Sequence, residues 1–234
     1  MDNLNYPLKK LFDTYGSIIV LDTETSGLDP LKNTIIELSA VKIISDGENT
    51  IITDELDYLI KLPEGEMLDE KIVELTHITD LMLKTEGILE KEACEKFSEL
   101  FKEDKILIVA YNAQFDMNFL FYFLARHNKA DILKKISMLD ALTVYKDRHD
   151  YPHKLENAIL IYNLGDKVQN SHRAIDDTLA TVEVLKCMDI ECDDLEKYIN
   201  LFGYNPKYGV SMRKISSVTY KPQGYKRYNK LYEE

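Results

Sequence analysis

The hydrophobic positions of the chain first follow the period of buried strands. The run SIIVLDTET at 17–25 is apolar and β-branched, and the turn-forming residues SGLDP end it. Two further runs of this kind, at 33–44 and 49–63, are joined by the turn SDGEN. Three strands with such short links predict an antiparallel meander.

From residue 86 onward the pattern alternates between helical and strand periods. We predict helices at 86–102, 113–127, 139–147, 153–163 and 172–188, and short buried strands at 105–111 and near 136–140. A meander followed by alternating strands and helices is typical of an α/β fold, in which helices pack on a mixed sheet of three antiparallel strands and two further strands.

Composition indicates an ordinary globular protein of 234 residues, with 45% apolar and 30% charged residues. We expect no signal peptide in the first residues, and the longest apolar stretches are too short to cross a bilayer. Cys94, Cys187 and Cys192 are odd in number and form no metal-ligand pattern. We therefore expect reduced thiols in a cytoplasmic protein with no membrane partner.

The net charge of −12 argues against a protein that binds nucleic acid through bulk electrostatics, but the charge is uneven. Residues 201–234 hold seven Lys/Arg against two Glu, a net +5, and six tyrosines. We expect one domain over 1–200 and a basic, Tyr-rich C-terminal extension over 201–234. The extension fits a surface for single-stranded nucleic acid; it also fits ordered packing on the acidic body, or docking on a partner protein.

Carboxylates occur where the pattern predicts apolar surroundings. Asp22 and Glu24 lie two apart on a predicted strand, so their side chains share one face. Asp116 falls on the apolar stripe of the helix predicted at 113–127. In the stretch NSHRAIDDT, helical phase aligns Asp177 with apolar positions, whereas Asp176 lies about 100° away on the more polar side.

Four carboxylates brought together would repel one another unless cations meet them. Oxygen ligands without cysteine suit Mg²⁺ or Mn²⁺, and two such ions are the recurring device of phosphodiester chemistry. His172, five residues before Asp177, has the pKa range of a general base.

Other polar residues fit structural roles. Arg148, His149, His153 and Lys154 form a small basic patch that we expect in a solvated loop before a helix, with phosphate contact as the alternative. Asp140 follows a short strand and is expected to cap a helix.

The motifs DTETSG, YNAQFD and HRAIDD resemble, in order, the three exonuclease motifs of the DEDD superfamily. The histidine five residues before the last acid matches the DEDDh branch, which includes the proofreading ε subunit of bacterial DNA polymerase III. The resemblance covers about residues 14–188 and implies a ribonuclease H-like sheet and an exonuclease domain over 1–200. It implies metal ligands at Asp22, Glu24, Asp116 and Asp177 and a catalytic base at His172.

The same resemblance implies a substrate site. Thr25, Leu28, Thr76 and Phe115 would line the terminal nucleotide, although the chain departs from the family pattern in the LTHIT turn that holds Thr76. Tyr111 stands where the family often has histidine. His77 in that turn is best interpreted as a surface residue.

The resemblance implies stepwise hydrolysis from a 3′ end that releases nucleoside 5′-monophosphates. We therefore expect a 3′–5′ exonuclease with two Mg²⁺ or Mn²⁺ ions that acts on single-stranded DNA. An exonuclease of RNA or short oligonucleotides would use the same motifs, because the metals grip phosphate and not sugar. An inert nucleic-acid or polymerase-associated binding module is a third interpretation, which the intact set of acids disfavours. A fourth is an exonuclease that works as a subunit of a DNA polymerase or repair assembly.

Overall fold

A computed structural model describes residues 6–102, 105–168, 173–224 and 229–233 of the chain. Five strands form one mixed sheet in the order β3-β2-β1-β4-β5. The strands are β1 (Ser17–Thr25), β2 (Ile35–Ser45), β3 (Thr50–Leu59), β4 (Ile106–Ala110) and β5 (Ser137–Asp140). The first three are antiparallel, and β4 and β5 run parallel to β1. The predicted α/β fold with a mixed sheet is confirmed.

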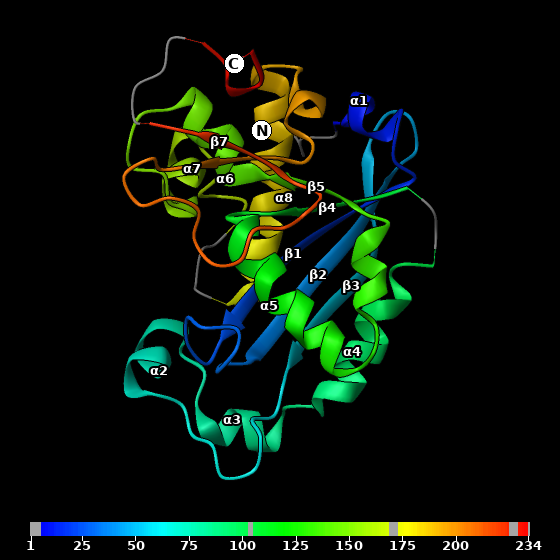
Figure 1. Ribbon diagram of the computed structural model, residues 1–234. Helices are drawn as coiled ribbons and strands as arrows, with labels where there is room; N and C mark the ends of the chain where they lie inside the picture. Colours follow the sequence, from blue (N-terminus) through cyan, green and yellow to red (C-terminus); the bar gives the residue numbers. More distant parts are fainter. Residues whose placement is uncertain (1–5, 103–104, 169–172, 225–228, 234) are drawn as a thin grey trace.

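Alternate side chains of β1 enter two different cores, one on each face of the sheet. Ile18 and Val20 pack with residues of the helices α6 (Ala141–Arg148), α7 (Leu155–Ile161) and α8 (Ala174–Glu191). Ile19 and Leu21 pack on the opposite face with α4 (Glu90–Glu99) and α5 (Ala113–Arg126). Figure 1 shows α4 and α5 in front of the sheet and α8 crossing it from the other side. Because β1 is the central strand, polar residues at its end alternate between the two faces and are desolvated there by the neighbouring elements.

Three short helices were not predicted from the sequence. They are α1 (Lys9–Phe12), α2 (Glu70–Thr76) and α3 (Asp80–Thr85). Side-chain caps begin two of them, since Asp69 accepts a hydrogen bond from Lys71 N and Thr79 accepts one from Met82 N. Both pack on a small third core around Ile36 and Ile78, so tertiary contacts stabilise helices too short to form alone.

The C-terminal extension packs against the sheet edge and α5. Its strands β6 (Leu201–Tyr204) and β7 (Thr219–Pro222) pair in parallel, after a short 3₁₀ turn at Leu195–Tyr198. Gln114 Nε2 donates to the carbonyls of Ser211 (2.7 Å) and Arg213 (2.9 Å). A last 3₁₀ turn, Leu231–Glu233, places Leu231 fully buried in the core beneath α8. Another 3₁₀ turn, Ala130–Lys134, leads into β5.

None of the helices among the described residues has the length and apolar composition needed to cross a membrane.

If the extension is part of the folded body, then Phe202→Ala should destabilise the whole protein. Phe202 is 2% exposed and packs with residues of β1 and α5, and such truncations cost about 3–5 kcal/mol. Urea unfolding should show one transition at a lower midpoint. Tyr208→Ala, at a side chain 72% exposed in the same extension, should stay within about 0.5 kcal/mol of the wild type. Equal stability of Phe202→Ala and the wild type would contradict this packing.

Candidate active site

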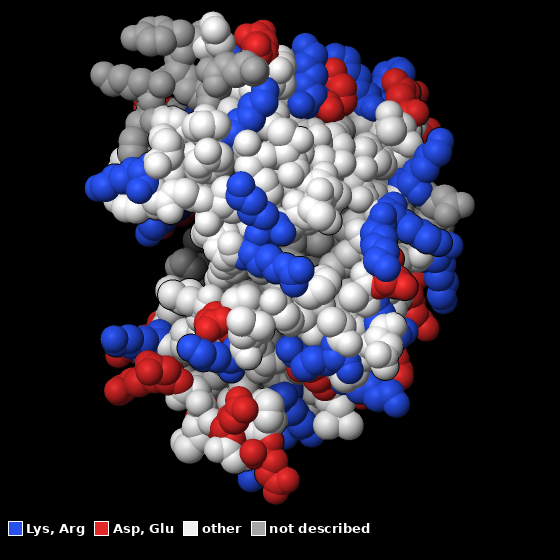
Figure 2. Space-filling view, viewed as in Figure 1, with Lys and Arg blue, Asp and Glu red and all other residues white. Residues whose placement is uncertain are grey.

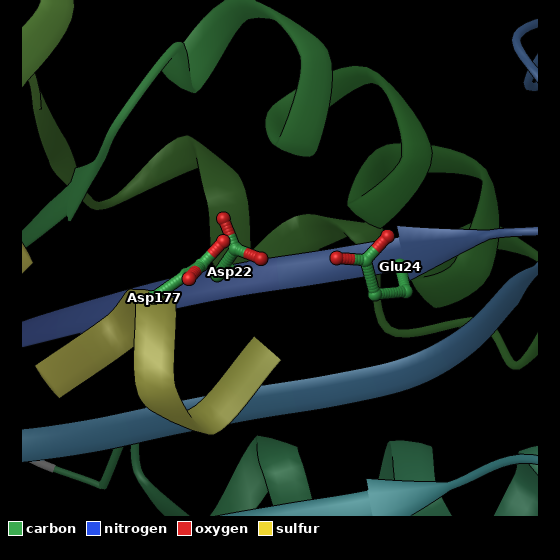
Figure 3. Close-up of side chains that lie close together, drawn as sticks. All are labelled: Asp22, Glu24 and Asp177. Carbon is green, nitrogen blue, oxygen red and sulfur yellow. The ribbon is translucent and has the colours of Figure 1, made fainter. Parts of the chain in front are cut away.

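Three carboxylates from two elements meet at the end of β1. Asp22 and Glu24 lie on the α8 face of the strand, in phase with Ile18 and Val20. One carboxylate oxygen from each of Asp22, Glu24 and Asp177 lies within 4.8 Å of the others. Figure 3 shows the Asp22 and Asp177 carboxylates side by side and that of Glu24 directed toward them. We call these three residues the acidic cluster.

Helix α8 delivers Asp177 from its first turn. Asp177 is 8% exposed, whereas Asp176 is only half-buried. The inward orientation of Asp177 therefore agrees with the helical phase of the sequence.

A buried glutamate that was not predicted from the sequence holds the start of α8. Glu37 of β2 is fully buried and lies directly opposite Glu24 in the sheet. Its Oε1 accepts hydrogen bonds from Arg173 Nε (2.8 Å) and Nη2 (2.5 Å), and its Oε2 accepts one from Ala174 N (2.9 Å). Arg173 is the N-cap of α8 and makes no cap with its own side chain. Glu37 thus caps the helix from another strand, where its negative charge also meets the positive end of the helix dipole.

Asp116 approaches β1 from the opposite face, at the first turn of α5. It is 3% exposed, and its Oδ1 accepts hydrogen bonds from Thr23 N (3.1 Å) and Thr23 Oγ1 (2.8 Å). Asp116 is not a member of the acidic cluster as the side chains stand in the described residues. Its charge nevertheless acts on Asp22, where it is the strongest of the neighbouring charges that raise the pKa of that carboxyl. The structure therefore joins Asp116 to the site electrostatically and through Thr23.

Burial and mutual repulsion raise the pKa values of these acids. Desolvation first, and then the charges of Asp116, Glu24 and Asp177, hold the pKa of Asp22 well above its usual range. Desolvation and the charge of Asp177 raise the pKa of Glu24 to about 8. Burial raises the pKa of Asp116 to about 7, against the lowering effect of its hydrogen bonds from Thr23. The nearby positive charge of the protein is too small to offset the burial and mutual repulsion of these acids, which oppose their ionisation at neutral pH.

The donor set fits a hard divalent cation. The ligand atoms are carboxylate oxygens from a strand and a helix, close enough to share one ion, and they repel one another without it. Both hydrogen bonds from Thr23 go to Oδ1 of Asp116. Oδ2 of Asp116 can therefore serve as a further metal ligand beside the acidic cluster. The side chains of Asp22, Glu24, Asp116 and Asp177 would hold such ions.

The residues expected to contact substrate lie in different environments. Leu28 is 78% exposed beyond the end of β1, and Phe115 is half-buried against Phe119. Thr25 is buried and its hydroxyl donates to the carbonyl of Gly27 (2.7 Å). The Thr76 hydroxyl is occupied inside α2, where it donates to Ile72 O (2.9 Å).

The neighbouring residue, Leu75, is exposed and lines a cavity that reaches Asp177. His77 is exposed at the C-terminus of α2, as expected for a surface turn residue. His172 lies outside the described residues.

The expectation that residues 148–154 form a solvated basic patch is wrong for Arg148 and for His153, which is also buried. The side chain of Arg148 is 2% exposed and forms ion pairs with Asp194 and Glu191, because the last turn of α8 and the residues that follow it lie against it. Asp140 caps α6 as expected, through Thr143 N (3.1 Å). Its other carboxylate oxygen also accepts bonds from the backbone of residues 112 and 113, where α5 begins.

The mixed sheet gathers carboxylates at the end of its central strand, and the sequence comparison identifies the class of protein. The profile described as "Exonuclease" (RNase_T) matches residues 19–185. The chain belongs to this exonuclease family and is a nuclease of it.

Curated relatives are much longer proteins. A DNA polymerase III PolC-type protein of Pediococcus pentosaceus is 34% identical over 166 residues, which is 71% of this chain and 11% of the relative. The PolC-type protein of Thermotoga maritima is 36% identical over 180 residues, 73% of this chain and 12% of the relative. The chain thus spans about a ninth of the length of these relatives.

Solved structures share the fold. E. coli Exonuclease I in complex with a dA16 oligonucleotide superposes with a TM-score of 0.67 at 21% identity, over 78% of this chain and 42% of that one. Exonuclease I of Methylocaldum szegediense gives 0.63 at 19% identity, over 76% and 41%. At these identities the likeness is one of fold.

The raised pKa of Glu24 predicts a pH-dependent effect of Glu24→Gln on stability in chelator. The pKa is about 8 in the folded protein and 4.5 in its ordinary state, so between these values the folded protein holds a proton that the unfolded chain releases. The proton bound by Glu24 therefore makes the free energy of unfolding of the wild type fall as pH rises between these values. The glutamine side chain of the variant carries no charge, so the melting temperature of the variant should exceed that of the wild type by an amount that grows between about pH 5 and pH 8, with each kcal/mol worth about 2–4 °C.

The matched control is Glu64→Gln, at an exposed position of the loop before α2. Its melting temperature should differ from that of the wild type by the same small amount at every pH. A Glu24→Gln difference that stays constant or shrinks with pH would show that Glu24 is not held protonated by its neighbours.

Proposed function

We propose that the chain is a divalent-metal-dependent 3′–5′ exonuclease of single-stranded DNA that releases nucleoside 5′-monophosphates. The observation that carries the proposal is the acidic cluster, in which Asp22, Glu24 and Asp177 bring three ligand oxygens within 4.8 Å, with Asp116 adjoining. Membership in the exonuclease family supports the reaction class. The oligonucleotide bound by the structurally similar E. coli enzyme supports the choice of a single DNA strand.

Two Mg²⁺ or Mn²⁺ ions held by these acids would polarise the scissile phosphate and lower the pKa of the attacking water. The chain's own residues then have separable tasks. Asp22 would be a ligand of these cations together with Glu24 and Asp177, and the charge of Asp116 from the other face also acts on it. Thr23 orients Asp116, and Glu37 with Arg173 sets the position from which α8 presents Asp177. Attack by water forms a new P–O bond, the bond from phosphorus to the 3′ oxygen of the preceding nucleotide breaks, and the shortened strand leaves with that oxygen.

We assign the general base to His172, which directly precedes Arg173 in the chain. It would accept the proton of the attacking water. The ion pair of Arg173 with Glu37 anchors the chain one residue away. Because a general base must meet the water in one geometry, this anchor supports the assignment.

The relatives named DNA polymerase III PolC-type support a role beside a DNA polymerase, in replication or repair. We therefore propose a DNA polymerase as the protein partner of this chain.

The assignment of ligands predicts that Asp22→Ala, Asp116→Ala and Asp177→Ala each abolish exonuclease activity while the fold is retained. Each variant removes a carboxylate needed to hold the cations. The assay follows 5′-labelled single-stranded DNA with Mg²⁺ or Mn²⁺, and the wild type should give a ladder that shortens from the 3′ end. Asp176→Ala is the matched control on the same helix turn and should retain most activity. Loss of activity in Asp176→Ala with an active Asp177→Ala would reverse the assignment.

Replacing His172 with alanine should slow hydrolysis by roughly 10²–10⁴-fold, the usual contribution of a general base. The pH–rate profile should also change on its acidic side, because the imidazole no longer contributes a titration there. Single-turnover rates on the same labelled strand measure both effects. A variant with a normal rate would mean that another group activates the water.

A further inference from the structure

A cavity of about 610 Å³ adjoins the acidic cluster on the side of Asp177. Its walls come from α6, from the segment that leads into α7, from Leu75 of α2 and from the C-terminal extension. Figure 2 shows an indentation at the left of the view, with Lys and Arg side chains above it and both basic and acidic side chains below it. We call this space the α6–α7 cavity.

Its lining carries the chemistry of a surface for a nucleic-acid strand. Lys146 of α6 and Lys154 at the N-cap of α7 bring positive charge into a protein with a net charge of −12. Lys154 is 3.6 Å from Glu156, and its side chain is mostly exposed. Tyr151 is 71% exposed, in edge contact with His153 at 5.8 Å between ring centroids. Lysines that pair with phosphates, together with an exposed ring on which a base can stack, form a single-strand binding surface.

The C-terminal extension supplies one wall, and hydrogen bonds to α6 hold this wall in place. Gln223 Nε2 donates to Thr143 O (2.8 Å), and Gly203 N donates to Thr143 Oγ1 (2.9 Å). Gln223 N also donates to Tyr204 O (2.7 Å). A Cβ at Gly203 would collide with the Gln223 side chain, so glycine is needed for this close approach. The part of the extension that lines the cavity, which includes Asn205, therefore belongs to the folded body.

The position of the cavity relative to the cluster decides which part of a strand it fits. The residues expected at the terminal nucleotide, Thr25, Leu28, Thr76 and Phe115, are not among those that line it, and Leu75 beside Thr76 marks its boundary on that side. The lining includes Asp177 of the acidic cluster as well as Lys146, Tyr151 and Lys154. A strand whose scissile phosphate sits at the acidic cluster would thus place its remaining, upstream part here.

We propose that the α6–α7 cavity binds the nucleotides on the 5′ side of the scissile phosphate of a single DNA strand. Lys146 and Lys154 contact phosphates, and Tyr151 stacks on a base. The C-terminal extension forms one side of the cavity along the strand. This inference rests on the proposed exonuclease function and adds to it a second binding surface, separate from the terminal nucleotide.

The test compares two substrates that differ only in their upstream part. The p-nitrophenyl ester of thymidine 5′-monophosphate occupies the cluster and the terminal site, whereas a dT12 oligonucleotide also has upstream nucleotides. The ratio of kcat/KM for dT12 to that for the ester should fall about 5- to 150-fold in Tyr151→Ala, the range expected for one lost base stack. It should also fall in the double variant Lys146→Ala/Lys154→Ala, through KM for dT12. Lys84→Ala and Tyr208→Ala, at exposed positions outside the cavity, are matched controls and should keep the wild-type ratio.

Salt dependence gives a readout that a merely structural role would not change. In chelator, which prevents hydrolysis, the slope of log Kd for labelled dT12 against log salt should become shallower by about 0.7 for each lysine removed. An unchanged ratio and an unchanged slope would overturn the proposal, as would an equal fall in the rates on both substrates. If the wild type hydrolyses neither substrate, the proposed function fails, and the binding slopes alone decide whether the cavity holds a strand. Deletion of the extension is no substitute for these variants, because Leu231 and Phe202 belong to the two main cores.

Discussion

The mutual repulsion of carboxylates at the end of β1 is the constraint on which the rest of the site depends. A central strand buried on both faces supplies the desolvation that raises the pKa of Asp22 and Glu24, and α8 adds a third acid to the same side. Such a cluster is unfavourable in the protein alone and becomes favourable when cations meet it. The fold therefore uses part of its stability to keep a high density of negative charge in place.

Two sets of hydrogen bonds resist that repulsion, one on each face of the sheet. On the α5 face, Thr23 holds Asp116 through its backbone and its hydroxyl. On the α8 face, Glu37 would add to the repulsion, since it lies opposite Glu24, but Arg173 and the first backbone N–H of α8 occupy both of its oxygens. The same carboxylate that pairs with Arg173 also fixes the first turn of α8. The contact of Glu37 with Arg173 and α8 therefore balances the charge of Glu37 and also fixes the position of Asp177.

The acids of the cluster could be found from the sequence because each breaks a local pattern. Asp22 and Glu24 interrupt an apolar strand, and helical phase separates Asp177 from Asp176. Glu37 breaks a pattern too, inside NTIIELSAVKII, but its partners lie 136 and 137 residues away. Nothing local to the strand indicates them. The meander and the two later strands followed from periodicity, whereas α2 and α3 did not, because these short helices depend on caps and on a small core that only the folded chain provides.

Composition could not separate the alternatives for the C-terminal extension, because the same aromatic and basic residues serve packing and binding. The hydroxyl of Tyr220 donates to Gln114 Oε1 (2.7 Å), and that of Tyr232 donates to Asp194 (2.7 Å), so these tyrosines act within the protein.

Asp140 connects this packing to the site. It accepts bonds from the start of α5 and from Thr143, and Thr143 in turn holds Gly203. Asp140 and Thr143 are hydrogen-bonded to each other. Together they position both the helix that carries Asp116 and the wall of the α6–α7 cavity. Two hydrogen-bonded side chains, Asp140 and Thr143, therefore connect the extension to the beginning of α5, the helix that presents Asp116 to β1.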